Sequence, residues 1–555
     1  MAHPVDQLNA SLTQLSRSHP DRWRVTSCGV TPALIQIPAL LHREAYATDT
    51  ARTRALLIAG LSGAEADTAL ALQALEALTR HEAEIGADWA WSAIPCGNPD
   101  GDRDLSRGYP PEGHFFNHPE EAEKRYLWRW ICFQAPGLVL ELRSGESVSW
   151  QGNPAAIRLA AALGGVALDE SDSLLGALGQ GHPDKLGVIP GLRLTSPSDQ
   201  LEVQLRRLVD AISGAPLVSA AQDALQARRA RSPLEVARIL ASLYGYVLDT
   251  PVNYTQGVGI SGRLRFASLA GGDAATASGI AQLVEPYVSQ QSPLFGDQPT
   301  GANLAGLLWG PELAEATGDR RYSDLVIEAS DRYQPAAGNA APPPSDPDFR
   351  CEDMFTGGAM LGRAYRLTSK TGYLDLLVKF LQDAHIQQAN GLFWHCRSAP
   401  YFWSRGNGFA ALGLTETLTY LPENYPHQGE VLEMYRRLLD GMLVVQHPSG
   451  MFTQLLDYPG SYQELTATCM MVYALARGLR QGWLAPSYRN ALDATWRAVS
   501  EHVDDTGNVM DGCASTGVQG TVKEYLDRPA VFGYDDRTGG MALWCAIEMA
   551  RLDRV

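Results

Sequence analysis

Short apolar runs alternate with helical patterns in the chain up to about residue 215. The runs at 54–61, 89–96 and 137–142 are bounded by glycine, proline or polar clusters, which is typical of buried strands. The Ala- and Leu-rich stretch at 66–78 follows the first run and has the composition of a crossover helix. The pattern therefore predicts an α/β domain with a buried sheet.

Amphipathic helices replace these strand patterns after about residue 232. Ser232 followed by Pro233 is an N-cap with proline at the first helical position, and apolar residues then recur at helical spacing. Three helix junctions carry a glycine, at Gly272, Gly318 and Gly372, and these glycines are 46 and 54 residues apart. Glycine supplies the left-handed residue that ends a helix, so this spacing predicts a repeated helical hairpin.

About six such hairpins fill the chain from residue 232 to its end. They predict a closed double ring of helices, with an open solenoid or an irregular bundle as the alternatives. The Pro- and Ala-rich segment 335–347 cannot continue a helix and is predicted to be a loop within this half. We therefore expect a multidomain protein, with an α/β domain at 1–225 and an all-α domain at 226–555.

The composition describes a globular chain of two or three folded units. The chain has 555 residues, of which 45% are hydrophobic and 19% charged, and this balance excludes disordered and fibrous proteins. Its net charge of −17 opposes binding to nucleic acid or to an anionic membrane, so we expect neither as a partner. An acidic ligand then requires a local cation.

Cysteine usage and the apolar pattern bear on the cellular setting. Eight cysteines lie far apart without a C-x-x-C pair, which indicates reduced thiols rather than a zinc ribbon or a disulfide framework. The sequence shows no secretory signal pattern and no uncharged apolar run of about 18 residues, so we predict a cytoplasmic protein. It also lacks a dinucleotide fingerprint and a phosphate loop, and we expect no cofactor.

Three segments of the α/β half resemble the zinc carboxypeptidase and deacylase superfamily. They are 59–65 (AGLSGAE), 95–101 (PCGNPDG) and 140–145 (LELRSG). The resemblance implies the fold of that superfamily, in which the first and third segments carry histidine ligands to zinc. Here Ser62 and Arg143 stand at those two positions and only Glu65 matches, so we expect a domain without a metal ion.

Two further groups in this half have both a functional and a structural interpretation. His114 and His118 are four residues apart, but glycine and proline flank them and no third ligand is nearby in sequence, so we favour a structural role. The second group consists of three arginines, Arg143, Arg107 and Arg103. In one interpretation they bind an anionic group of the substrate, and in the other they form ordinary ion pairs.

Five phrases of the helical half resemble unsaturated uronyl hydrolases, and most closely the unsaturated rhamnogalacturonyl hydrolase family, glycoside hydrolase family 105. The phrases occur in the family's order at 317–322 (TGDRRY), 352–355 (EDMF), 392–395 (LFWH), 403–409 (WSRGNGF) and 464–468 (ELTAT). The similarity covers roughly residues 235–553. It implies an (α/α)6 barrel with a pocket for a terminal 4,5-unsaturated uronic acid.

Asp353 matches the catalytic aspartate of that family. Such an enzyme protonates the enol ether of the unsaturated sugar at C4, after which water adds at C5 and the hemiketal collapses to release the neighbouring sugar. The reaction needs a proton donor near neutral pH, and apolar neighbours such as Phe355 and Trp403 are expected to raise the pKa of Asp353. The alternative is an aspartate that only caps the following helix.

The phrase at 403–409 supplies the expected substrate-binding residues. The guanidinium of Arg405 can form a bidentate contact with a carboxylate, which gives an acidic protein the cation that a uronate needs. Trp403 and Phe409 flank it and are expected to stack on sugar rings, with ordinary core packing as the alternative. His395 matches an active-site histidine of the family that hydrogen-bonds substrate hydroxyls or assists the water, and a structural histidine is its alternative.

The family's second aspartate has no clear counterpart in this chain. Counting back from the 317–322 phrase places Asn303 nearest to that position, and we expect its amide to orient water in the catalytic site without transferring a proton. Asp297, six residues earlier, is a carboxylate in a loop and is predicted to take part in substrate binding. A single aspartate argues against hydrolysis of saturated glycosides, which needs two carboxylates.

The sequence thus predicts a hydrolase that removes a terminal 4,5-unsaturated uronate from oligosaccharides generated by a lyase. Two alternatives stay open. One is a glycosidase that acts on saturated uronides, with Asp297, Asp457 or Glu464 as its second carboxylate. The other is a catalytically silent carbohydrate-binding protein. Nothing in the sequence fixes the number of subunits, and an oligomer is compatible with it.

Overall fold

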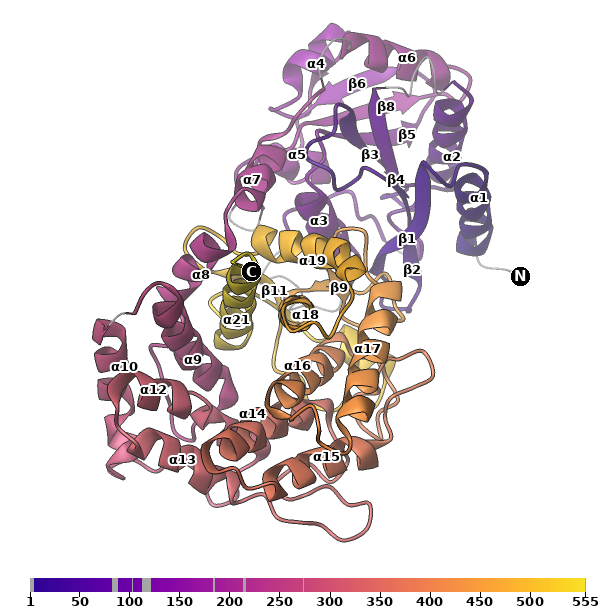
Figure 1. Ribbon diagram of the computed structural model, residues 1–555. Coiled ribbons are helices and arrows are strands. Elements are labelled where there is room, and N and C mark those ends of the chain that lie inside the picture. Colours follow the sequence, from indigo (N-terminus) through magenta and orange to yellow (C-terminus); the bar gives the residue numbers. More distant parts are fainter. Residues whose placement is uncertain are drawn as a thin grey trace. The chain divides into compact units, whose positions relative to one another are not determined.

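The computed structural model of the protein describes residues 4–81, 88–101, 103–111, 121–182, 185–212, 216–272 and 274–554. The chain forms two compact units, each with its own hydrophobic core (Figure 1). The first unit consists of residues 1–230 and 459–462, and the second of residues 231–458 and 463–555. His114 and His118 lie outside the described residues.

The first unit combines helices with one mixed sheet. In chain order its elements are α1 (Pro4–Ser18), β1 (Trp23–Val30), β2 (Gln36–His42), β3 (Thr53–Ala59), α2 (Glu65–Arg80), β4 (Trp89–Ile94), α3 (Ala122–Gln134), β5 (Leu138–Ser144), β6 (Ser149–Gly152), α4 (Ile157–Ala162), β7 (Val166–Ala167), α5 (Leu174–Leu178), β8 (Gly191–Ser196), α6 (Leu201–Ala211) and α7 (Ala220–Arg229).

Among the described residues, the sheet has eight strands in the order β1-β2-β4-β3-β5-β8-β6-β7. Strands β4, β3, β5 and β8 are parallel to one another, whereas β2 and β6 run antiparallel to β4 and β8. β3 and β4 are buried along their whole length, and α1, α2 and α6 share one core with the sheet. The predicted strands β3, β4 and β5 and the predicted helix α2 are confirmed.

The second unit is mainly helical. Its elements are α8 (Pro233–Ala241), α9 (Tyr254–Leu269), α10 (Ala274–Val288), α11 (Gly301–Leu304), the 3₁₀ helix η3 (Ala305–Leu307), α12 (Gly310–Thr317), α13 (Arg321–Ser330), α14 (Cys351–Thr368), α15 (Gly372–Ala384), α16 (Ser404–Tyr420), α17 (Gln428–Val444), β9 (Phe452–Thr453), β10 (Gln463–Glu464), α18 (Leu465–Arg480), η4 (Pro486–Tyr488), α19 (Arg489–Glu501), β11 (Val509–Cys513), α20 (Val522–Leu526), β12 (Ala530–Gly533) and α21 (Asp536–Leu552).

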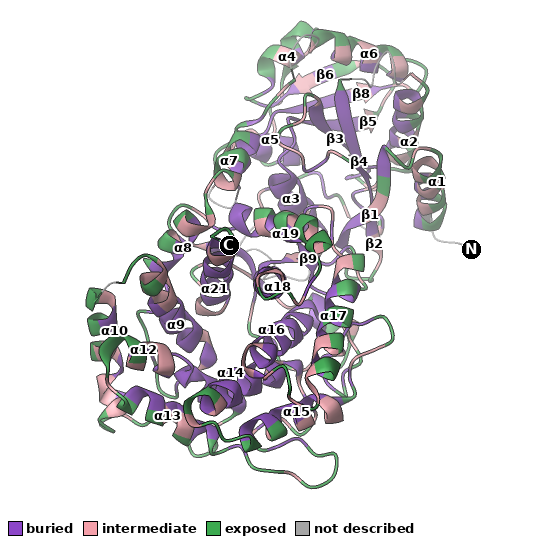
Figure 2. Ribbon diagram, in the orientation of Figure 1, coloured by how far each residue is buried: buried purple, intermediate pink, exposed green. Residues whose placement is uncertain are grey.

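The long helices of this unit pack in a closed series (Figure 1). α9, α21, α18, α16 and α14 are neighbours in that order, and the short pieces α11, η3 and α12 connect α14 back to α9. α8, α10, α13, α15, α17 and α19 pack against this inner set. Figure 2 shows the inner helices α14 and α16 buried along most of their length, whereas α10 and α17 each expose one face.

Glycines bring the two central helices α14 and α16 into close contact. A Cβ atom on Gly413 of α16 would lie 2.4 Å from the carbonyl carbon of Met354 in α14. A Cβ atom on Gly358 of α14 would lie 2.9 Å from the carbonyl oxygen of Gly413. Real side chains do not pack at such distances, so glycine at both positions lets the backbones of the two helices touch.

Helix boundaries follow the local signals with one exception. Glu235 N–H donates to Ser232 at 3.3 Å and Ser232 N–H donates to the Glu235 carboxylate at 2.7 Å, so α8 begins with a capping box. Gly318 follows α12 with a φ of 77°, as predicted. Gly372 is instead the first residue of α15, because Ser369 already takes the left-handed conformation after α14, with a φ of 59°. The expected role of Gly372 as a helix stop was therefore wrong.

Two further observations complete the fold. Residues 331–350 form neither helix nor strand, which confirms the loop predicted around 335–347. No helix in the described part of the chain is both long and apolar enough to cross a membrane.

Candidate active site

The first turns of the inner helices meet at one end of the second unit. Cys351 of α14 lies beside Gly406 of α16, whose next glycine, Gly408, packs against Ala467 of α18. Asp353 is in the first turn of α14, and Arg405 is in the first turn of α16. Free backbone N–H groups at helix starts favour negative charge, so this end is electrostatically suited to an anionic ligand.

Asp353 is a buried carboxyl group. Its side chain accepts hydrogen bonds from the backbone N–H of Asp346 at 2.9 Å and from the hydroxyl of Thr356 at 3.3 Å. Burial raises the pKa of Asp353 to about 7, and the charges of Glu352 and Asp346 act in the same direction, whereas the Asp346 N–H opposes the shift. An acid with this pKa is still partly protonated at neutral pH, which general acid catalysis needs.

Gly301 and Tyr333 lie on another side of the same carboxyl group. A Cβ atom on Gly301 would be 2.8 Å from Asp353 Oδ1 and 3.2 Å from the Tyr333 hydroxyl, so only glycine lets α11 come this close. Burial and the charge of Asp353 raise the pKa of Tyr333. Its phenol therefore stays neutral and places a hydroxyl beside the acid.

Glu352 points away from Asp353 because adjacent residues of a helix do not face each other. Its Oε1 atom is 3.2 Å from Nε2 of His395, and Nδ1 of the fully buried His395 is 2.6 Å from the Tyr525 hydroxyl. Although burial acts to raise it, the pKa of Glu352 is lowered by the charge and hydrogen bond of His395 and by Arg405. Glu352 is therefore the ionised neighbour of a protonated acid.

Arg405 is held in place near Glu352. The guanidinium stacks 4.5 Å from the ring centre of Trp403, and its Nη1 donates to the carbonyl oxygens of Cys513 at 2.6 Å and Ala514 at 3.0 Å. Its Nε atom is buried and has no hydrogen-bond partner among the described residues. Arg405 thus has an anchored guanidinium with donor capacity left for a carboxylate.

Glu464 holds the segment that anchors Arg405. Its carboxylate accepts hydrogen bonds from the backbone N–H groups of Thr466 at 2.6 Å, Ala467 at 2.7 Å and Cys513 at 3.0 Å. Burial raises the pKa of Glu464, and these hydrogen bonds together with Arg405 oppose the shift. The side chain therefore ties the start of α18 to β11.

Both aromatic residues of the 403–409 phrase are buried. Trp403 is fully buried against the His395 ring, with 4.4 Å between ring centres. Phe409 is 1% exposed and packs on Phe355 at 6.0 Å and on Tyr254 at 5.6 Å. In this structure both side chains pack beneath the surface against other aromatic rings. Their stacking on sugar rings stays a prediction.

Asn303 and Asp297 differ in their surroundings. The Asn303 side chain accepts hydrogen bonds from the N–H of Thr300 at 3.0 Å and from its hydroxyl at 2.8 Å, and donates to the Val252 carbonyl at 2.9 Å. The amide therefore caps α11, the helix that carries Gly301 against Asp353. Asp297 is exposed in the preceding loop. The catalytic role of Asn303 and the binding role of Asp297 stay predictions.

Three residues of the first unit, Ser62, Glu65 and Arg143, stand at the positions where the resembling superfamily binds zinc. Their side chains do not fit a zinc ion. The Ser62 hydroxyl donates to Asp67 at 3.1 Å, and the Arg143 guanidinium binds Glu141 at 2.7 Å. Glu65 is exposed. A hydroxyl and a cation cannot replace two imidazole ligands. Within the described ranges, no three His, Cys, Asp or Glu side chains are grouped closely enough to hold a metal ion.

The arginines considered for anion binding in the first unit are paired. Arg103 lies 2.8 Å from the Glu123 carboxylate, and Arg107 lies 2.8 Å from Asp172 and 3.2 Å from Glu170. Arg143 is held by its contact with Glu141. These contacts favour the ion-pair interpretation of the three arginines.

Several residues of the site were not singled out from the sequence. Glu352 stands inside the EDMF phrase, but no role was expected for it. Tyr525, Tyr333 and Thr356 contact the catalytic candidates without belonging to any of the five phrases. Only the helical spacing of Thr356 from Asp353, three residues, was a usable signal.

Residues 247–553 match the sequence profile of Glycosyl Hydrolase Family 88, which is more than half of the chain. The chain belongs to this family. A solved structure of a family 105 glycoside hydrolase from C. acetobutylicum has a TM-score of 0.51 at 16% identity, with 57% of this chain and 99% of that chain covered. The helical unit therefore has the fold of these hydrolases.

Two curated relatives carry more specific names. An unsaturated 3S-rhamnoglycuronyl hydrolase of Alteromonas sp. (strain LOR) is 27% identical over 113 residues, which are 20% of this chain and 27% of that protein. An unsaturated rhamnogalacturonyl hydrolase of Bacillus subtilis (strain 168) is 27% identical over 188 residues, which are 32% of this chain and 53% of that protein. The chain thus spans from about a quarter to about half of the length of these relatives.

Proposed function

We propose that the protein removes a terminal 4,5-unsaturated uronic acid from oligosaccharides that a polysaccharide lyase has produced. The observation that carries this proposal is Asp353, a buried acid in the first turn of α14 whose pKa is raised to about 7. Membership of Glycosyl Hydrolase Family 88 supports it, as do the two relatives named unsaturated uronyl-type hydrolases. The closed series of inner helices supports an (α/α)6 barrel as the architecture.

Asp353 starts the proposed reaction as a general acid. Its carboxyl proton goes to C4 of the enol ether, and positive charge develops at C5 and the ring oxygen. Water then adds at C5 and loses a proton, which gives a hemiketal. The hemiketal opens, the bond to the neighbouring sugar breaks, and that sugar leaves with a hydroxyl group. The net change is the consumption of one water molecule.

The other candidates have distinct parts in this proposal. Arg405 binds the uronate carboxylate through its remaining donors, at an end where helix N–H groups also favour an anion. His395 is held by Glu352 and Tyr525 and contacts the added water or a substrate hydroxyl. Asn303 orients water from α11, Trp403 and Phe409 shape the sugar site, and Asp297 contributes from the exposed loop.

A second free carboxylate would favour the hydrolysis of saturated uronides instead. Glu352 is bound to His395, and Glu464 accepts three backbone hydrogen bonds. These contacts commit the two glutamates to structural partners, and Asp297 and Asp457 are exposed. Hydration of an activated enol ether, which needs a single acid, therefore fits this site better.

For the N-terminal part we propose a domain at 1–225 with a zinc carboxypeptidase-like fold and no metal site, followed by the hydrolase domain at 226–555. The three motif segments support this: 59–65 and 95–101 begin at the ends of β3 and β4, and 140–145 overlaps the end of β5. Such an arrangement places all three at one edge of the parallel strands.

The test uses the ultraviolet absorbance of the conjugated enol ether. Purified full-length protein is incubated with lyase-generated oligosaccharides, and the absorbance band is followed together with the released sugars. The proposal predicts that the band disappears as the neighbouring sugar appears. Release of a saturated uronate with an unchanged band shows a conventional glycosidase, and no change in either shows a silent binding protein; both results refute the proposal.

A further inference from the structure

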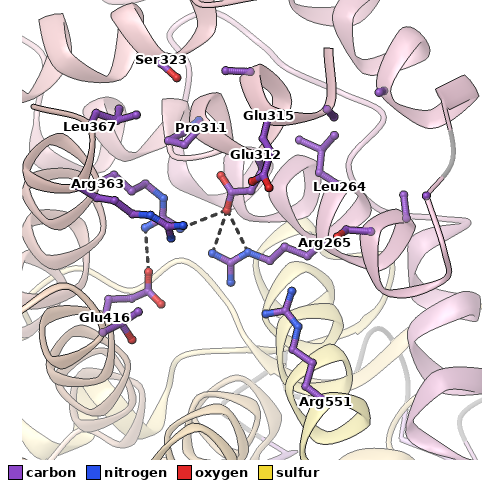
Figure 3. A pocket seen from close by; sticks show the side chains of 18 of the residues that line it. Leu264, Arg265, Pro311, Glu312, Glu315, Ser323, Arg363, Leu367, Glu416 and Arg551 are labelled. Carbon is purple, nitrogen blue, oxygen red and sulfur yellow. Dashed lines mark hydrogen bonds and ion pairs between the residues drawn. The ribbon is translucent and has the colours of Figure 1, made fainter. Parts of the chain in front are cut away.

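A cavity of about 1250 Å³ lies at the C-terminal ends of the inner helices (Figure 3). Asp353 is at the other end, in the first turn of α14. Its walls come from the last turns of α9, α14, α16 and α18, from α12, from the starts of α10 and α13, and from Arg551 at the end of α21. The cavity is therefore separate from the candidate active site, although both are built on the same helices.

Arginine dominates the wall of this cavity. Three glutamates, Glu312, Glu315 and Glu416, line it, against six arginines: Arg265, Arg363, Arg366, Arg477, Arg480 and Arg551. This excess of arginine lies in a protein whose net charge is −17.

The deepest charges are paired with each other. Arg363 lies 2.8 Å from Glu416 and 3.5 Å from Glu312, and Arg265 lies 3.0 Å from Glu312. Although burial acts to raise it, the pKa of Glu416 is lowered to about 2 by Arg363, Arg265 and Arg477. Figure 3 shows this chain of paired side chains across the cavity, in which Glu312 and Glu416 are committed to arginines.

Two arginines of the cavity, Arg551 and Arg366, have little negative charge to meet. Arg551 makes one ion pair, at 3.7 Å to Glu548, and Glu548 already binds Arg477 at 2.8 Å and Arg480 at 2.6 Å. Burial and the positive charges of Arg265 and Arg477 lower the pKa of Arg551. Arg366 is exposed at the rim and has no ion pair among the described residues.

Buried polar atoms of the cavity also lack partners. The Nε atom of Arg363, a residue only 2% exposed, has no hydrogen-bond partner in the described part of the chain. A buried donor without a partner is costly, and an acceptor brought by a ligand would satisfy it. Figure 3 shows the Arg551 guanidinium directed toward the same space, close to Arg265.

We propose that this cavity is a second ligand site, which binds a small anionic molecule through an oxyanion group. Guanidinium groups bind carboxylate, phosphate and sulfate oxygens with the same bidentate geometry, so these three groups share the recognition chemistry. The volume is sufficient for a sugar acid or a sugar phosphate. The inference does not rest on the proposed hydrolase activity, because it concerns other residues at the other end of the helices.

The test measures binding of two probes to the full-length protein by titration calorimetry at low ionic strength. Inorganic phosphate and sodium glucuronate are the probes, and sodium chloride at equal ionic strength is the reference. Arg551→Gln and Arg366→Gln remove arginines with few partners. Arg497→Gln is the matched control, because Arg497 is exposed on α19 and does not line the cavity.

We expect saturable binding of at least one probe, weakened about tenfold or more in Arg551→Gln and unchanged in Arg497→Gln. The tighter probe then identifies a phosphate or a carboxylate as the preferred group. No saturable binding of either probe overturns the proposal. Binding that is equal in wild type and in both cavity variants also overturns it, because the ligand then binds elsewhere, for example at Arg405.

Discussion

Glu352 and Asp353 are adjacent carboxyl groups whose pKa values are shifted in opposite directions. Burial raises the pKa of Asp353 to about 7, whereas the hydrogen bond and charge of His395 hold the pKa of Glu352 below its ordinary value. The negative charge of Glu352 is itself one reason why Asp353 keeps its proton. The two side chains point away from each other on the helix, so Asp353 can stay protonated while Glu352 is ionised.

The pH profile of activity should depend on this pair. Because Asp353 must be protonated to act as an acid, kcat/KM is expected to be level below about pH 7 and to fall above it. Glu352→Gln removes a charge that raises the Asp353 pKa, so the descending limb is expected to move to lower pH. Glu328→Gln, an exposed glutamate on α13, is the control. If the fall in kcat/KM occurs at the same pH in Glu352→Gln as in wild type, the charge of Glu352 does not raise the pKa of Asp353, and this prediction is wrong.

Asp353 should also make stability depend on pH. The pKa is raised in the folded state, so the folded protein holds a proton that the unfolded chain releases between about pH 4 and pH 7. This contribution to stability is complete at low pH and is lost as the pH rises through about 7. A tenfold difference in proton affinity between the folded and unfolded states corresponds to about 1.4 kcal/mol in the free energy of unfolding. Asp353→Asn should therefore gain in melting temperature relative to wild type at pH 8 but not at pH 4. Equal differences at both values contradict this prediction.

Arg405 is expected to affect both binding and folding. Arg405→Lys removes the planar group that stacks on Trp403 and donates to the carbonyl oxygens of Cys513 and Ala514. The lost hydrogen bonds should cost about 1–3 kcal/mol of stability. Lysine cannot form a bidentate contact with the uronate carboxylate, so KM should rise tenfold or more. Steady-state kinetics and thermal unfolding measure the two effects, and an unchanged KM refutes the binding role.

Asn303→Asp tests the prediction that Asn303 stands where the resemblance places a second aspartate. An aspartate still accepts from Thr300, but it loses the donor to the Val252 carbonyl and places a negative charge against that oxygen. We expect a loss of about 1–3 kcal/mol in stability and no gain in activity on saturated uronides. Asp297→Asn, an exposed change in the preceding loop, is the stability control. A variant as stable as wild type shows that Asn303 is not a necessary cap.

Local patterns predicted much of the fold because their causes are local. The apolar runs became β3, β4 and β5, and the proline-rich segment before α14 is irregular. The wrong assignment of Gly372 has the same origin, since the sequence marks a turn there but not which residue takes the left-handed conformation. Strands β1, β2, β6, β7 and β8 were not predicted, because their runs are short or interrupted by polar residues.

The sequence phrases singled out individual residues of the candidate site, but not the contacts between residues that are far apart in the chain. Arg405 and Trp403 are two residues apart, and their stacking follows from the helix start. His395 and Tyr525 are 130 residues apart, and only the fold brings them together. The cationic cavity shows the same limit, because its arginines come from four different helices and each alone resembles a helix-end arginine.

The most direct test of the account compares wild type with Asp353→Asn on lyase-generated oligosaccharides, with the enol ether absorbance as the readout. Asparagine keeps the size of the side chain and can still accept from the Asp346 N–H, so circular dichroism should show an unchanged fold. The account predicts that the absorbance band decays with wild type and persists with the variant. Decay at a similar rate with Asp353→Asn would contradict it, because the proton would then come from another group.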